Sequence, residues 1–327
     1  MNSPSSNLSS PSAGPDRRHI LKNCLAGASA LGAWSMAGGL MAQSAVQVKP
    51  KFRYCLNTST INGRNVMIRE QIKIASKAGY DSVEIWLRDV GRMVEAGGKL
   101  KDLASEIADL GLKVDSAIAF ANWIVDDEQK RKVGLEQAKR DMAIVAELGG
   151  THIAAPPAGA TREPGLDLDA AADRYRDLLE VGKAVGVVPQ VELWGFSKNL
   201  SRLEEVLHVA AGADHPDACV LLDVYHLYKG GCDFNNMDLV PGRKMHCLHM
   251  NDYPADPPRA QIGDKDRVYP GDGVAPLTRI LRALAAGGFS GTLSLELFNP
   301  YYHKQPAQEV AATGIQKMKR AVAVAYA

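Results

Sequence analysis

Residues 245–273, MHCLHMNDYPADPPRAQIGDKDRVYPGDG, contain the clearest signal for the fold and the functional site of this chain. It begins as a short apolar run with strand character and turns polar at His249, Asn251 and Asp252, where that strand should end. Three prolines within residues 253–259 exclude a helix at this point, because proline lacks the backbone N–H and restricts the residue before it. A strand that ends in polar residues and a long loop is typical of a functional cavity.

The rest of the chain supplies seven more strand-like runs, and the eight together predict a (β/α)8 barrel. Between the runs, apolar residues recur at three- and four-residue steps, as at Leu100, Leu103 and Ile107, which is the period of a helix. Eight strands that alternate with helices, over roughly 250 residues without a linker, are typical of this barrel. The expected strands are residues 52–57, 82–87, 113–120, 151–156, 187–193, 218–223, 244–250 and 291–297.

An open, doubly wound sheet is the competing fold. It would require a glycine-rich phosphate-binding turn after its first strand, whereas the sequence LNTSTINGRN at residues 56–65 has a single glycine. We therefore predict an α/β protein with a single (β/α)8 TIM barrel over residues 50–325. In such a barrel the chemistry lies at the C-terminal ends of the strands.

The first 42 residues have the pattern of an export signal. Arg17 and Arg18 precede CLAGASALGAWSMAGGLMA at residues 24–42, which is weakly apolar and rich in small residues. This order resembles a twin-arginine signal peptide with cleavage after Ala42 or Ala45. The resemblance implies the Tat translocation machinery as a partner and a periplasmic or otherwise exported protein. A membrane contact is expected only if the signal stays uncleaved, because the stretch is too weakly apolar for a typical membrane span.

The overall composition argues against nucleic acid as a partner. The 38 Lys and Arg residues are balanced by 37 Asp and Glu residues, so there is no basic excess to bind a phosphate backbone. The cysteines show no CxxC spacing, and buried free thiols are the expectation for those in apolar strand-like runs. A homo-oligomer is one option for the assembly of the protein.

Three further strand-like runs end on a carboxylate, and these residues together with His249 form the predicted metal site. Glu192 lies in VPQVELWG, Asp223 in ACVLLDVYH and Glu296 in GTLSLELF. An aspartate at a strand end often caps the next helix. Glu192 and Glu296, however, lie inside apolar runs without a flanking Lys or Arg, where an unpaired charge is costly to bury. A divalent cation would supply the counter-charge, and oxygen-rich ligation with one imidazole suits Mn, Co, Zn or Mg.

A cation at this site predicts proton chemistry beside a carbonyl group. A divalent ion that binds a carbonyl oxygen and a neighbouring hydroxyl stabilises an enediolate, and removal of the proton requires a positioned base. Glu192 and Glu296 are expected on opposite flanks of the ion, so that one can remove a proton and the other can return it. A small carbohydrate or cyclitol is therefore the expected partner.

Other polar and aromatic residues near strand ends have two interpretations each. His246 lies three residues before His249 and is expected on the opposite side of the strand, as a satisfied core residue. His152 is either a support for the site or a core residue. Trp86 and Trp194 are candidates for stacking on a sugar face, with core packing as the alternative.

The series of strand ends resembles the xylose isomerase-like TIM barrel family of sugar isomerases and epimerases. The matching segments are VELWG with Glu192, DVYH with Asp223 and His226, LHMND with His249, and SLELF with Glu296. Within this family, residues 219–302 are similar to the inosose isomerases through HMND, DKDRVYPGDG and LELFNPYY. The resemblance covers roughly residues 52–320 and is specific in the last third.

The resemblance implies the same four metal ligands, with Glu192 and Glu296 also acting as acid and base. It further implies that His226 and Arg267 hold oxygen atoms of the substrate. Ketose 3-epimerases of the family place a second carboxylate one turn after the first ligand, whereas this chain has Lys198 in that region. The expected activity is a divalent-metal-dependent isomerisation or epimerisation of a keto-cyclitol or keto-sugar through a metal-stabilised enediolate.

Three alternatives remain open at the level of the sequence. A lyase would use the same proton abstraction to cleave a 3-keto-glycoside by β-elimination, which would suit an exported protein. A nuclease related to the apurinic endonucleases would need three zinc ions and several histidines, but only His152, His226 and His249 are candidates at strand mouths. A catalytically inactive sugar-binding protein is disfavoured, because all four ligand types are present.

Overall fold

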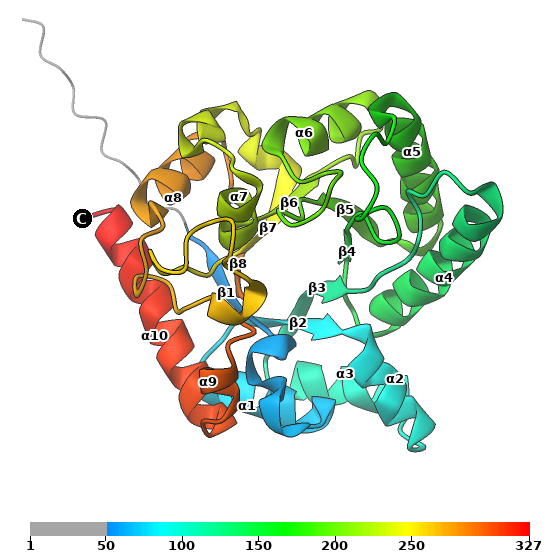
Figure 1. Ribbon diagram of the computed structural model, residues 1–327. Helices are drawn as coiled ribbons and strands as arrows, with labels where there is room; N and C mark the ends of the chain where they lie inside the picture. The colour runs from blue at the N-terminus through cyan, green and yellow to red at the C-terminus, as the bar shows by residue number, and fades with distance from the viewer. Residues whose placement is uncertain (1–50) are drawn as a thin grey trace, which may run out of the picture. The chain divides into compact units, whose positions relative to one another are not determined.

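Eight parallel strands, one for each run expected from the sequence, form the centre of the computed structural model, which describes residues 51–327 (Figure 1). Their hydrogen-bonded order is β3-β2-β1-β8-β7-β6-β5-β4, so β3 and β4 lie at the two ends of a nearly closed barrel. The strands are β1 (Arg53–Asn57), β2 (Ser82–Trp86), β3 (Lys113–Ile118), β4 (His152–Ala155), β5 (Val188–Glu192), β6 (Val220–Asp223), β7 (Met245–His249) and β8 (Thr292–Leu295). The predicted TIM barrel is thereby confirmed, while the predicted signal at residues 1–42 lies outside the described residues.

Helices form an outer layer around the strands (Figure 1). Their apolar stripes explain this placement: in α8, for example, Ile280, Leu281 and Leu284 are fully buried, and burial of each such side chain contributes about 1.5–3 kcal/mol. The α-helices are α1 (Ile68–Ala78), α2 (Leu87–Glu95), α3 (Leu100–Asp109), α4 (Glu128–Glu147), α5 (Leu168–Val185), α6 (Leu203–Gly212), α7 (Val224–Gly230), α8 (Leu277–Ala286), α9 (Pro300–His303) and α10 (Ala307–Ala325). Short 3-10 helices are η1 (Thr58–Arg64), η2 (Phe234–Leu239), η3 (Gly242–Lys244) and η4 (Asp264–Asp266).

The strands contribute to two separate apolar clusters, because successive side chains point to opposite faces. Outward-facing residues such as Leu222 and Leu248 belong to the large cluster that includes the helices. A smaller cluster inside the barrel combines one residue from each of five strands. These residues are Trp86, Ile118, Ala154, Leu221 and Cys247. The interior is therefore packed, and the space for a ligand lies at the carboxyl ends of the strands.

An extra residue in β7 changes the direction of one histidine. Val220 pairs with Met245, but Leu222 pairs with Leu248, so β7 has a bulge that breaks the simple alternation. The ring of His246 lies 4.1 Å from that of His152, the first residue of β4. Because β4 and β7 are not neighbours in the sheet, this contact crosses the barrel interior, and the predicted placement of His246 on the opposite side of the strand from His249 is wrong. Both rings lie near the amino-terminal end of the barrel, away from the predicted site.

Within residues 51–327, no helix is both long and apolar enough to cross a membrane.

Candidate metal centre

The four predicted ligands come together around one atom, Nδ1 of His249. Glu192, Asp223 and His249 are the last residues of β5, β6 and β7, and Glu296 directly follows β8. The carboxylate oxygens of Glu296, Asp223 and Glu192 lie 3.2, 3.6 and 3.7 Å from that nitrogen. All four side chains are buried. Neighbouring parallel strands end at the same rim, so the barrel brings residues more than a hundred positions apart into one site.

The arrangement fits a divalent cation. The buried Nδ1 atom of His249 makes no hydrogen bond, although three carboxylate oxygens surround it. Ligands about 2.1 Å from a common ion lie about 3.0–3.5 Å from one another in octahedral or tetrahedral sites, close to the 3.2, 3.6 and 3.7 Å between Nδ1 and the three carboxylates. The ligand atoms of Asp223, His249 and Glu296 all lie within 4.8 Å of one another, and Glu192 approaches the same nitrogen. Burial of so many carboxylates also requires positive charge nearby. One cation among these four residues would satisfy both the nitrogen and the oxygens.

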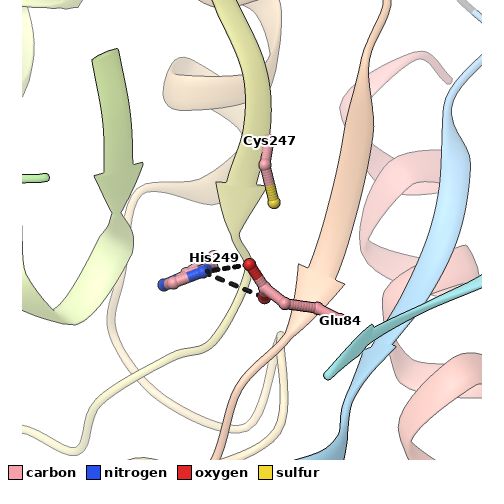
Figure 2. A group of neighbouring side chains, drawn as sticks. All are labelled: Glu84, Cys247 and His249. Carbon is pink, nitrogen blue, oxygen red and sulfur yellow. Dashed lines mark hydrogen bonds and ion pairs between the residues drawn. The ribbon is translucent and has the colours of Figure 1, made fainter. Parts of the chain in front are cut away.

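A fourth carboxylate, Glu84 of β2, contacts the other ring nitrogen of His249. The oxygens of Glu84 lie 3.1 and 3.0 Å from Nε2 of His249, as Figure 2 shows. Glu84 also accepts hydrogen bonds from Asn57 (2.8 Å) and Ser294 (2.7 Å). A carboxylate on one imidazole nitrogen directs the other toward a metal and fixes the ring. Nδ1 is therefore the ligand atom that His249 presents.

The sequence analysis missed this role of Glu84, although a signal was present. Glu84 lies in the apolar run SVEIWL, the same context that singled out Glu192 and Glu296. Cys247 lies in the same group as Glu84 and His249 (Figure 2). Burial raises the pKa of the Cys247 thiol well above its usual value, so it stays protonated, in agreement with the expectation of a buried free thiol.

Arg267 supplies counter-charge that the local sequence did not indicate. Its Nη1 donates to Asp223 (2.8 Å) and to Glu296 (2.9 Å), and the side chain is 1% exposed. Glu296 was expected to lack a basic partner because none flanks it in the sequence, and the structure corrects this: its partner comes from the loop after β7. Glu192 has no arginine or lysine partner among the described residues, and His249 is the one side chain able to carry positive charge that lies within 4 Å of it there.

The loop that carries Arg267 is held by Asp252. The carboxylate of Asp252 accepts hydrogen bonds from the backbone N–H groups of Tyr253, Gly271, Gly273 and Ala275. A Cβ at Gly273 would lie 2.2 Å from the carbonyl oxygen of Tyr253, so this close approach requires glycine. The predicted change from strand to irregular loop is thus present, and its polar residues organise the loop from within.

Asp223 combines the two roles that the sequence left open. Its Oδ1 caps α7 by accepting from the backbone N–H of His226 (2.8 Å). Its Oδ2 faces the site and accepts from Arg267 and from Asn251 (2.9 Å). The helix cap therefore orients the carboxylate whose other oxygen is available to a metal.

A cavity of about 450 Å³ opens onto the carboxylates. The predicted substrate-binding residues Trp86, Trp194, His226 and Arg267 all line it, together with Glu192 and Glu296. The sequence analysis did not select the other lining residues. These are Ile118, Phe120, Phe196, Asp264, Lys265 and Phe298.

Comparison with known proteins identifies the family. The sequence model of the xylose isomerase-like TIM barrel matches residues 72–321. The chain belongs to this family. The resemblance predicted from the strand ends is therefore confirmed, including its relation to the inosose isomerases.

Relatives in this barrel family include enzymes of more than one reaction type. The inosose isomerase of Bacillus velezensis is 25% identical over 264 residues, which are 80% of this chain and 94% of that enzyme. The 3-dehydroshikimate dehydratase of Pseudomonas putida is 25% identical over 250 residues, which are 76% of this chain and 39% of that protein. The crystal structure of the IolI protein with a zinc atom shares the fold, with a TM-score of 0.76 at 24% identity over 84% of this chain and 99% of that one.

The charges of the site set its protonation before a metal binds. Burial raises the pKa of Glu192 to about 8, assisted by Glu296 and Asp223 and opposed by His249. Burial alone would lower the pKa of His249, but Glu296 and Glu84 hold it well above its usual value. Burial would likewise raise the pKa of Asp223, but Arg267 holds it below its usual value. At neutral pH the metal-free site therefore carries protons on His249 and Glu192.

We expect Glu84→Gln to weaken metal binding about 10–100-fold, because residues that orient a ligating histidine have effects of this size. The Kd for Zn²⁺ or Mn²⁺, measured by titration of metal-free protein, is the readout. Glu95→Gln at the exposed end of α2 is the matched control and should leave the Kd unchanged. Equal affinity of the parent and Glu84→Gln would show that His249 needs no such support.

Metal uptake should also release protons, and affinity should increase as the pH rises toward about 8, the pKa of Glu192. Ligands must lose their protons before they bind, and each step up in pH leaves fewer protons on Glu192 and His249 to displace. Isothermal titration calorimetry in buffers of different ionisation enthalpy measures this release. A binding heat independent of the buffer would contradict the assigned protonation.

Proposed function

We propose that this protein is a divalent-metal-dependent isomerase or epimerase of a keto-cyclitol or keto-sugar. The observation that carries the proposal is the placement of Glu192 and Glu296, two buried carboxylates on the same cavity, beside Nδ1 of a histidine that is oriented by Glu84. The inosose isomerase relative supports the choice of a keto ring as substrate.

Glu192, Asp223, His249 and Glu296 are the residues that would hold the metal. When bound, a divalent ion would act as a Lewis acid that polarises a carbonyl oxygen and so acidifies the neighbouring C–H bond. Mn, Co, Zn and Mg all suit this donor set. The zinc atom of the structural neighbour IolI favours zinc as the first ion to test.

Glu192 and Glu296 are the proposed acid and base. Burial raises the pKa of Glu192 to about 8 in the metal-free protein, and a bound cation would displace that proton and leave Glu192 able to accept one. Glu296 lies 3.2 Å from the same nitrogen of His249 and accepts a hydrogen bond from Arg267 (2.9 Å). One carboxylate takes a proton from the carbon beside the carbonyl, and the other, protonated from solvent, donates a proton to the opposite face or to the neighbouring atom.

Arg267 and His226 are the proposed contacts for substrate oxygens. The buried Nε of Arg267 and Nδ1 of His226 have no hydrogen-bond partner, so both remain available. Burial lowers the pKa of His226 to about 4, so its ring is neutral. Because its Nε2 faces a donor of Arg267 at 3.1 Å, the tautomer with the proton on Nδ1 is favoured, and Nδ1 can donate to an oxygen.

Glu192→Gln and Glu296→Gln should each lower proton exchange at the carbon beside the carbonyl at least about 100-fold. The measurement is deuterium uptake from D2O into an inosose or a ketohexose by the metal-loaded protein, with the metal content of each variant determined. A chelator should abolish the exchange, and Glu95→Gln should not change it. Exchange that persists in both variants with the metal retained would exclude these roles.

A lyase that acts on a 3-keto-glycoside is the second candidate. The dehydratase relative supports it, since loss of water and loss of an alcohol both follow proton removal beside a carbonyl. Release of the aglycone, rather than deuterium uptake into unchanged substrate, distinguishes the two activities. The nuclease alternative has lost support, because His152 lies at the other end of the barrel.

We further propose export through the Tat pathway, supported by Arg17, Arg18 and the weakly apolar stretch after them. Replacement of both arginines by lysine in the full chain should retain the protein in the cytoplasm, because the Tat machinery recognises the paired arginines of the signal. Fractionation of a bacterial host followed by immunoblotting measures this. Equal export of the parent and the double variant would contradict the assignment.

A further inference from the structure

Five aromatic side chains line the cavity beside the carboxylates, and we call them the aromatic belt: Trp86, Phe120, Trp194, Phe196 and Phe298. Adjacent ring centroids lie 5.2–5.9 Å apart, in the order Phe298, Trp86, Phe120, Trp194 and Phe196. These are ordinary distances for aromatic pairs in contact. The belt is therefore one continuous apolar surface.

His226 and Arg267 close the row into a ring. The His226 ring lies 5.6 Å from that of Phe196, and the Arg267 guanidinium lies 3.1 Å from His226 and 5.1 Å from the centre of the Phe298 ring. The two residues proposed to hold substrate oxygens are thus part of the same enclosure. The belt and the carboxylates Glu192 and Glu296 therefore line one cavity.

The belt exposes aromatic surface that packing alone does not explain. Phe120 is 41% exposed and Phe196 is 47% exposed, and both line the cavity. Contiguous exposed apolar surface in a concave site usually marks the place of a ligand. Neither residue contributes to the charged end of the cavity, so their role concerns a different part of the ligand.

The belt offers few partners for hydroxyl groups. Three of its members are phenylalanines, and the indole N–H of Trp86 already donates to Asn57 (2.8 Å). Each carbon of a bare cyclitol or sugar ring carries an oxygen, and burial of a hydroxyl without a partner is unfavourable. The face of a bare keto ring can stack on Trp86 or Trp194, but its hydroxyl groups would find few partners among the belt residues, so the belt suits an apolar substituent better.

The volume of the cavity also exceeds the volume of a bare keto ring. About 450 Å³ corresponds to about fifteen waters at about 30 Å³ each, whereas a keto-cyclitol has about twelve covalently linked heavy atoms that pack more tightly than waters. A keto-cyclitol alone would therefore leave part of this cavity, which the belt residues line, unfilled.

We infer that the keto ring of the natural substrate carries an aryl substituent, which binds in the aromatic belt while the keto ring reaches Glu192 and Glu296. This inference rests on the proposed function for the identity of the keto ring, and it adds the class of its substituent. Offset and edge-to-face contacts with the belt would hold an aryl ring without requiring hydrogen bonds.

The test compares two ligands that differ only in this substituent: a keto-cyclitol, and the same keto-cyclitol with one hydroxyl replaced by a phenoxy group. The metal-loaded full chain should bind the phenoxy compound about tenfold more tightly or better, as measured by calorimetry. Phe120→Ala and Phe196→Ala should each reduce the ratio of the two Kd values several-fold. Both phenylalanines are partly exposed, so the variants should fold.

Tyr301→Ala is the matched control, because Tyr301 is a 67% exposed aromatic residue outside the cavity lining, and it should leave the ratio unchanged. Equal affinity of the parent for the two ligands, or a preference that survives in both phenylalanine variants, would overturn the inference. Deuterium exchange is measured in parallel. If deuterium exchanges into the bare keto-cyclitol but the two Kd values are equal, only the inference about the aromatic belt is contradicted. If the phenoxy compound binds more tightly but no deuterium exchanges, the belt inference is supported and the proposed reaction is contradicted.

Discussion

The neutralisation of buried carboxylates is the constraint on which the site depends. Glu84, Glu192, Asp223 and Glu296 are each at most 4% exposed, and Arg267 is the one arginine in direct contact with members of this group among the described residues. Charges in such a place are stable only with counter-charges or protons. The metal-free protein meets this need with Arg267 and with protons on His249 and Glu192. A divalent cation meets it without the protons, which links metal binding to pH and to the reactivity of the two glutamates.

The barrel explains why these groups can be both buried and available. Apolar side chains from five strands pack inside the barrel, and the carboxylates lie between this low-dielectric interior and the cavity at the carboxyl ends of the strands. Each ligand lies at or next to the last residue of its strand, where the next loop can hold it. Asp223 illustrates this: the N-terminus of α7 binds one of its oxygens and leaves the other for the site.

The cavity has a charged end and an apolar end, built from different residues of the same loops. Glu192 ends β5, and Trp194 and Phe196 follow it in the same segment. Glu296 and Phe298 have the same relation after β8. In the proposed function, the proton chemistry and the recognition of the remainder of the substrate are therefore assigned to neighbouring positions. Change in the belt residues would alter the substrate without disturbing the carboxylates.

The amino-acid sequence was sufficient to predict the eight strands, the barrel and four candidate ligands at one rim, because hydrophobic periodicity and carboxylates inside apolar runs are local patterns. It did not determine the pairing of Arg267 with Glu296, the support of His249 by Glu84, or the aromatic belt. Each of these joins residues from different strands or loops, and their contact depends on barrel closure. The bulge that turns His246 inward is likewise a property of pairing with β6. Hydrophobic periodicity predicts which face of a helix or strand is apolar. Which side chains contact one another across the barrel depends on how the strands pair and close.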